Sequence, residues 1–124
     1  MLIEKLTYRL NELIKQTAGL NKTNQPLIKE VMPVIFDAYT QPHRKYHNLK
    51  HLEQMFNELD QCPQNTAVMQ WATWFHDIIY QPGDKNNETK SAQLAKQIMS
   101  QLDIPNNQIK KTIAYLVTYK TLTE

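Results

Sequence analysis

The sequence predicts an all-α fold: a bundle of about six helices that forms one domain over residues 1–124. Three observations lead to this prediction. Apolar residues recur at steps of three and four through most of the chain, which is the spacing of one helix face. Proline, glycine and asparagine separate these stretches. No stretch alternates apolar and polar residues as a half-buried strand would.

Three helical patterns occupy the first half of the chain. Gly19–Asn24 separates the first from the second, and Pro26 suits the first turn of the second. We expect Pro33 to bend or shorten that second helix, because proline removes a backbone hydrogen bond. A polar linker at 41–46 precedes the third. Their apolar positions are, in order, Ile3, Leu6, Leu10, Leu13 and Ile14; Leu27, Val31, Val34, Ile35 and Ala38; and Leu49, Leu52, Met55, Phe56 and Leu59.

The fourth helical pattern is apolar on nearly every side, which predicts a place at the centre of the bundle. The turn at Pro82-Gly83 follows it. Its apolar residues are Val68, Trp71, Ala72, Trp74, Phe75, Ile78 and Ile79.

Two further helices complete the predicted bundle. Asn86 or Asn87 can cap the fifth. Asp103 or Asn106 begins the sixth, with Pro105 in its first turn. The residues expected to face inward are Ala92, Ala95, Ile98, Met99 and Leu102, followed by Ile109, Ile113, Leu116 and Val117.

Composition argues against several classes of protein. Fourteen Lys and Arg against 12 Asp and Glu leave a net charge of +2 and no basic run, so nucleic-acid binding is not indicated. The single cysteine, Cys62, cannot form an internal disulfide. Charged residues interrupt the apolar N-terminus and no apolar run is long enough for a membrane span. A cytoplasmic location is the default expectation.

The sixth helical pattern is still periodic at Leu116 and Val117, with seven residues remaining. A helix that faces a core usually has a following element that completes the packing. We therefore expect the chain to be the N-terminal portion of a longer domain. Uncovered apolar helix faces would then favour a homodimer or a mobile C-terminus.

Two short clusters hold three of the four histidines: Tyr-His-Asn-Leu-Lys-His at 46–51 and Trp-Phe-His-Asp at 74–77. His and Asp are metal-ligand types, and two helices packed side by side could bring them to one ion. His76 and Asp77 point about 100° apart on an ideal helix, so they share a site only near its edge or at a fraying helix end. The simpler alternative is that the histidines are structural, as we expect for His43.

The segments at 42–51, 74–80 and 87–92 resemble the HD-domain superfamily of metal-dependent phosphohydrolases, and most closely its small bacterial branch of predicted hydrolases. The Tyr-His-Asn-x-x-His stretch also resembles cyclic-nucleotide phosphodiesterases of the same superfamily. The similarity runs from about Val31 to the end of the chain. The zinc-protease pattern, in contrast, needs a glutamate after the first histidine, and position 48 is asparagine.

The resemblance implies a role for several residues. His51, His76 and Asp77 match metal ligands, and Asp77 thereby also belongs to the catalytic centre. His47 matches the phosphodiesterase histidine that protonates the leaving oxygen.

The resemblance also suggests substrate-side residues. Arg44 could hold a phosphate oxygen through its planar fork. Glu88 lies where many members place a group that supports the metal or binds a second one. A simple helix-start carboxylate is an equally good interpretation of Glu88.

The implied reaction is hydrolysis of a phosphoester in a nucleotide or other phosphorylated small molecule by a metal-activated water. Mixed nitrogen and oxygen ligands fit Mn, Fe, Co, Ni or Zn. The sequence departs from the family pattern in two places. Tyr80 stands where phosphodiesterases have a further histidine. The aspartate that closes the family's metal shell has no counterpart, since Asp84 and Asp103 lie in other contexts.

Three functional classes stay open at this stage. The chain could be part of an HD-type phosphohydrolase, inactive or weakly active in this shortened form. It could be a non-catalytic helical binding or regulatory module that keeps a partial metal site. It could also be a helical interaction domain without a metal, in which the histidines are structural.

Overall fold

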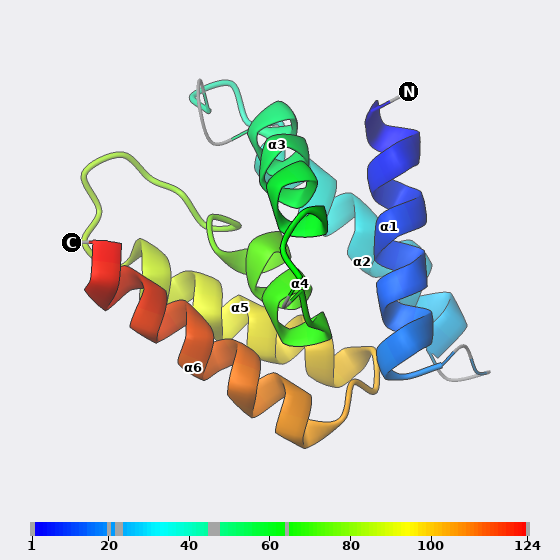
Figure 1. Ribbon diagram of the computed structural model, residues 1–124. Coiled ribbons are helices and arrows are strands. Elements are labelled where there is room, and N and C mark those ends of the chain that lie inside the picture. Colours follow the sequence, from blue (N-terminus) through cyan, green and yellow to red (C-terminus); the bar gives the residue numbers. More distant parts are fainter. Residues whose placement is uncertain (1, 20, 22–23, 45–47, 64, 124) are drawn as a thin grey trace.

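Six α-helices and no strand make up the described part of the chain (Figure 1). The computed structural model describes residues 2–19, 21, 24–44, 48–63 and 65–123, with side chains up to residue 117. This architecture confirms the predicted all-α bundle. The helices are α1 (Leu2–Thr17), α2 (Asn24–Tyr39), α3 (Leu49–Asp60), α4 (Ala67–Phe75), α5 (Asn87–Gln101) and α6 (Asn106–Thr123).

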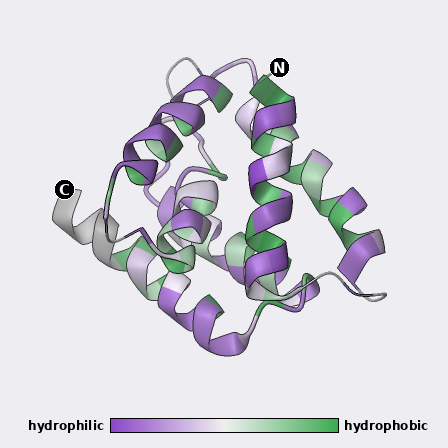
Figure 2. Cartoon of the chain, turned by 45° about the vertical axis from the view of Figure 1, so that its right-hand side comes forward, coloured by the Kyte–Doolittle hydropathy of each residue, from purple (hydrophilic) through white to green (hydrophobic). Residues whose placement is uncertain are grey.

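α1 shows how the apolar periodicity produces the packing. Leu6, Leu10 and Leu13 are at most 2% exposed, whereas Ile3 at the start of the helix is 52% exposed. Figure 2 shows the resulting alternation of hydrophobic and hydrophilic segments along this helix. Gly19, two residues after α1, has φ +73°, a conformation that glycine adopts without a steric penalty.

α4 occupies the centre of the bundle, as its uniformly apolar sequence predicts. It contacts α1, α3, α5 and α6, and Figure 1 shows it between the α1–α3 group and the α5–α6 pair. Trp71, Trp74 and Phe75 are fully buried. Packing from several sides therefore fixes the position of the residues that follow α4.

α4 ends earlier than the sequence predicts. We expected Ile78 and Ile79 to continue the helix, but the last helical residue is Phe75. The amide of Ile78 donates to Phe75 O over 3.3 Å, as in a tighter turn, instead of to Trp74 O. Side chains from other elements donate hydrogen bonds to the carbonyls of Trp74, Asp77 and Ile78, in place of helical amides. Ile78 nevertheless lies in the core at 1% exposure.

Besides Ile3, two residues that we expected to face inward are exposed. Val34 is 48% exposed and Val117 is 55% exposed. Each is next to a buried residue, Ile35 and Leu116 respectively. Adjacent side chains on a helix point about 100° apart, so only one of each pair reaches the core.

Helix boundaries elsewhere follow the predicted signals closely. Pro33 lies inside α2, and the helix still extends to Tyr39. Asn86 is the N-cap position of α5, although its side chain makes no capping hydrogen bond. Pro105, which we expected in the first turn of the sixth helix, immediately precedes α6. None of the described helices is both long enough and apolar enough to cross a bilayer.

Candidate metal centre

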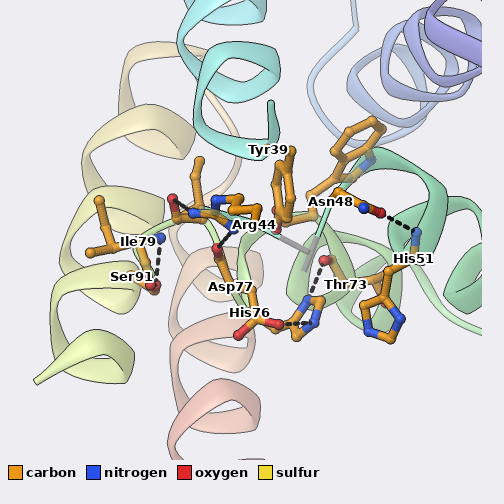
Figure 3. A network of polar contacts seen from close by, with 11 residues as sticks. Tyr39, Arg44, Asn48, His51, Thr73, His76, Asp77, Ile79 and Ser91 are labelled. Atoms are coloured by element: carbon orange, nitrogen blue, oxygen red, sulfur yellow. Dashed lines mark hydrogen bonds and ion pairs between the residues drawn. The ribbon is translucent and has the colours of Figure 1, made fainter. Parts of the chain in front are cut away.

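The start of α3 positions His51. Asn48 is the N-cap of this helix, and its side-chain oxygen accepts a hydrogen bond from the backbone amide of His51 over 3.1 Å (Figure 3). A capping contact of this type fixes the first turn of a helix. His51 therefore projects from an anchored turn, at the end of α3 that lies near the end of α4.

His76 and Asp77 follow the last residue of α4, outside its regular helical part. The fraying helix end that we considered from the sequence is thus present. The Nδ1 atom of His76 lies 2.8 Å from the carbonyl oxygen of Thr73. The Nε2 atom of His76 lies 2.8 Å from Oδ2 of Asp77. The turn after α4 therefore allows the two neighbouring side chains to meet.

The structure brings together the three residues that match metal ligands in the sequence. His51, His76 and Asp77 each offer one ligand atom, and these atoms all lie within 4.8 Å of one another. The two imidazole rings have centroids 6.2 Å apart. All three residues are half-buried. Within the described residues, this is the one group of three or more His, Cys, Asp or Glu side chains with such spacing.

In its neutral form, the His76 imidazole would turn a lone pair toward a carboxylate. The Thr73 carbonyl can only accept, so the proton of the imidazole lies on Nδ1. Nε2 then turns its lone pair toward Asp77 Oδ2 at 2.8 Å. Two such atoms need a proton or another cation between them. A carbonyl that holds Nδ1–H is also the usual way in which a protein presents Nε2 to a metal.

The donor set suits a divalent transition metal, and the spacing approaches what such an ion needs. Two ligands at about 2.1 Å from one ion are about 3.4 Å apart in a tetrahedral shell. The His76–Asp77 separation of 2.8 Å is shorter than this value and the 4.8 Å limit for the whole group is longer, so the side chains would have to move to share one ion. Two imidazole nitrogens and one carboxylate oxygen suit Mn, Fe, Co, Ni or Zn.

Tyr39 and Arg44 hold the backbone behind these ligands. The Tyr39 hydroxyl donates to Trp74 O over 2.6 Å. The Arg44 guanidinium donates from Nη1 to Asp77 O over 2.6 Å and from Nη2 to Ile78 O over 2.8 Å. Figure 3 shows Tyr39 and Arg44 together above the Asp77 backbone, with the imidazoles below it. Carbonyls at the end of α4 thus gain partners from outside the helix.

Burial shifts the pKa values of both Tyr39 and Arg44. Desolvation raises the pKa of the Tyr39 phenol far above its ordinary range, and the negative charge of Asp77 adds to that rise. Burial lowers the pKa of Arg44, while Tyr39 and Asp77 act in the opposite direction. The guanidinium also lies over the Tyr39 ring, 5.0 Å from its centroid. Arginine remains charged under ordinary conditions, so a buried cation lies close to the candidate site.

The other residues predicted for the site have different surroundings. Arg44 is 4% exposed and binds backbone carbonyls, so its predicted contact with a phosphate oxygen stays a prediction. Glu88 is half-buried in the first turn of α5 and is not one of the three grouped ligands. His47 lies outside the described residues. His43 is exposed, stacks on Tyr80, and has Nε2 2.8 Å from the Tyr80 carbonyl oxygen.

The two aspartates considered as a closing ligand do not join the grouped ligands. Asp84 pairs with Lys90 over 2.8 Å, and this contact holds the pKa of its carboxyl below the usual range. Asp103 adopts φ +62° in the turn before α6. Neither belongs to the three-residue group found among the described side chains.

Sequence reasoning missed three supporting residues: Tyr39, Thr73 and Ser91. The Ser91 hydroxyl accepts a hydrogen bond from the Ile79 amide over 3.0 Å and is 1% exposed. A serine directly before the buried Ala92 was the available signal for this contact. Tyr39 carries no comparable signal, because its partner is a backbone carbonyl. Thr73 contributes its own backbone carbonyl, a group that every residue has.

Comparisons with protein-family models, with curated proteins and with solved structures each find no match for this chain. The geometry of the site and the motif resemblance are therefore the guides to its function.

Proposed function

We propose that the chain binds a divalent transition metal through His51, His76 and Asp77 and belongs to a metal-dependent phosphohydrolase of the HD type. Its substrate class is a nucleotide or another phosphorylated small molecule. The observation that carries the proposal is the grouping of three ligand atoms within 4.8 Å of one another, from residues 25 and 26 positions apart in the chain.

Each side chain has a defined part in the proposed site. His76 presents Nε2 because the Thr73 carbonyl occupies Nδ1. Asp77 contributes a negative oxygen, and His51 reaches the same point from α3. When bound, a divalent metal would supply a nucleophilic water at neutral pH and offset phosphoryl charge.

Two residues complete the proposed reaction. His47 would give a proton to the leaving oxygen, a role that follows from the motif resemblance alone. Glu88, near the start of α5, would serve the substrate side of the site.

Metal content tests the proposal directly. We expect the purified chain to take up cobalt(II) or zinc(II) at about one equivalent. Loss of a direct ligand in His76→Ala or Asp77→Ala should weaken binding by more than the roughly 10- to 100-fold that outer partners contribute. His43→Ala is the matched control, because this histidine lies outside the three-residue group. Equal metal content in all four proteins would remove the proposed site.

Hydrolysis is measured separately, with bis(4-nitrophenyl) phosphate and a set of nucleoside phosphates. Metal-dependent turnover that disappears in Asp77→Ala would support the enzyme. Metal binding without turnover on any of these compounds would favour the alternative, a non-catalytic helical module with a partial metal site.

A further inference from the structure

The last turn of α4 and the segment after it are held in place by side chains from three other parts of the chain. Tyr39 at the end of α2 binds Trp74 O. Arg44, in the connection after α2, binds the carbonyls of Asp77 and Ile78. Ser91 of α5 accepts a hydrogen bond from the amide of Ile79. These contacts restrain a segment that has no regular helical hydrogen bonds.

Arg44 has the geometry of a backbone support. Its Nη1 and Nη2 atoms donate to two consecutive carbonyls, which matches the planar fork of a guanidinium. Its Nε donates to the Gln41 side chain over 3.2 Å. The tyrosine rings of Tyr39 and Tyr80 flank it, with centroids 5.0 and 5.7 Å away. The group is 4% exposed, so its orientation is tightly constrained.

These contacts act on the same residues that offer metal ligands. The carbonyl that Arg44 binds belongs to Asp77, so the hydrogen bond fixes the peptide plane from which the carboxylate projects. The carbonyl that Tyr39 binds lies between Thr73, which orients His76, and His76 itself. A displacement of this backbone would separate Asp77 Oδ2 from His76 Nε2. A metal site is sensitive to ligand geometry at this scale.

We infer that Arg44, assisted by Tyr39, is a positioning residue that presents His76 and Asp77 to the metal, in place of the substrate contact predicted from the sequence. The inference rests on the proposed metal site. If Arg44 positions the ligands, changes at Arg44 alter metal affinity in the absence of any substrate. If Arg44 only contacts the substrate, they do not.

Cobalt(II) binding by the whole chain tests this claim. The variants are Arg44→Lys, which keeps the charge but loses the fork, Arg44→Met, and Tyr39→Phe, which removes one hydroxyl. Arg9→Met is the matched control. Arg9 packs over Phe56 and pairs with Asp60, both later in α3 than His51, so its loss removes a comparable guanidinium without touching the segment after α4. Circular dichroism and thermal melting identify the variants that remain folded.

We expect Arg44→Lys and Arg44→Met to weaken cobalt affinity by about 10- to 100-fold, as loss of an outer partner does in metal sites. The visible cobalt spectrum of the folded Arg44→Lys protein should also change, because the ligand arrangement changes. Tyr39→Phe should give a smaller change in the same direction. Arg9→Met should match the wild-type chain.

The outcomes separate this inference from the proposed function. If the folded wild-type chain binds no cobalt, the proposed metal site is wrong, and the positioning role falls with it. If the wild-type chain binds cobalt and folded Arg44→Lys and Tyr39→Phe keep its affinity and spectrum, the positioning role alone is overturned. Unchanged cobalt affinity with reduced phosphoester turnover would instead support the predicted contact of Arg44 with the substrate.

Discussion

The hydroxyl of Tyr39 donates to the backbone carbonyl of Trp74 over 2.6 Å, across 35 positions of sequence. This bond joins the end of α2 to the last turn of the central helix α4. Tyr39 is 1% exposed, so the bond is shielded from solvent. The stability of the bundle and the geometry of the candidate site therefore share one contact.

Tyr39→Phe should change the pH dependence of stability at the alkaline end. Burial, followed by the charge of Asp77, raises the pKa of Tyr39, and the cation of Arg44 opposes this rise. Below the ordinary tyrosine pKa of about 10 the phenol is neutral in both states. Above it, only the unfolded chain loses the proton, so stability falls as pH rises.

Urea unfolding at pH 7 and near pH 11 measures this effect. The variant should lose about 1–2 kcal/mol at pH 7, because the Trp74 carbonyl is left without the hydroxyl. It should then lose less stability than the wild-type chain on going to high pH. Tyr8→Phe, at a residue 69% exposed, is the control and should behave like the wild-type chain. An equal loss of unfolding free energy between pH 7 and pH 11 in Tyr39→Phe and in the wild-type chain would contradict the prediction.

Ser91→Ala should loosen the segment after α4. The hydroxyl accepts from the Ile79 amide over 3.0 Å, and removing it leaves that amide without this partner. We expect a loss of about 1 kcal/mol and faster hydrogen exchange at Ile79. Ser100→Ala, at an exposed position of the same helix, should leave both quantities unchanged. Unaltered exchange at Ile79 in Ser91→Ala would show that the contact does not restrain the segment.

Asn24→Ala should be among the most destabilising polar substitutions. The Asn24 side chain is fully buried, and its amide nitrogen lies 2.8 Å from Gly19 O and 3.3 Å from Leu102 O. It thereby joins the start of α2 to the end of α5. We expect a loss of about 1–3 kcal/mol, because buried backbone carbonyls lose a donor. Chemical denaturation measures this loss. Asn57→Ala, at an exposed position of α3, is the control. A similarly small loss of unfolding free energy in both variants would refute the prediction.

His51→Ala tests whether α3 and the end of α4 share one ion. A metal that binds only the folded state stabilises it by about 2.7 kcal/mol at 100 times its dissociation constant. Cobalt(II) should therefore raise the melting temperature of the wild-type chain and of His43→Ala. His51→Ala should show little or no rise at the same cobalt concentration. A full rise in His51→Ala would mean that this histidine is not a ligand.

Much of the fold follows from local patterns. The spacing of Leu6, Leu10 and Leu13 predicts α1, because an isolated helix already places these residues on one face. The run around Trp71 and Trp74 predicts a central helix, since such a segment has no polar side to expose. The pairing of His51 with His76 and Asp77 as possible ligands also follows from residue types and motif resemblance.

The end of α4 and the surroundings of Arg44 do not follow from local patterns. Nothing near Phe75 requires the helix to stop there. The carbonyls of Trp74, Asp77 and Ile78 are bound by side chains that lie more than thirty positions earlier in the chain. A hydrogen bond of that kind exists only after the helices have packed. Periodicity therefore identifies which residues enter the core. Packing determines which side chain reaches which backbone atom. These long-range hydrogen bonds set the geometry of His76 and Asp77.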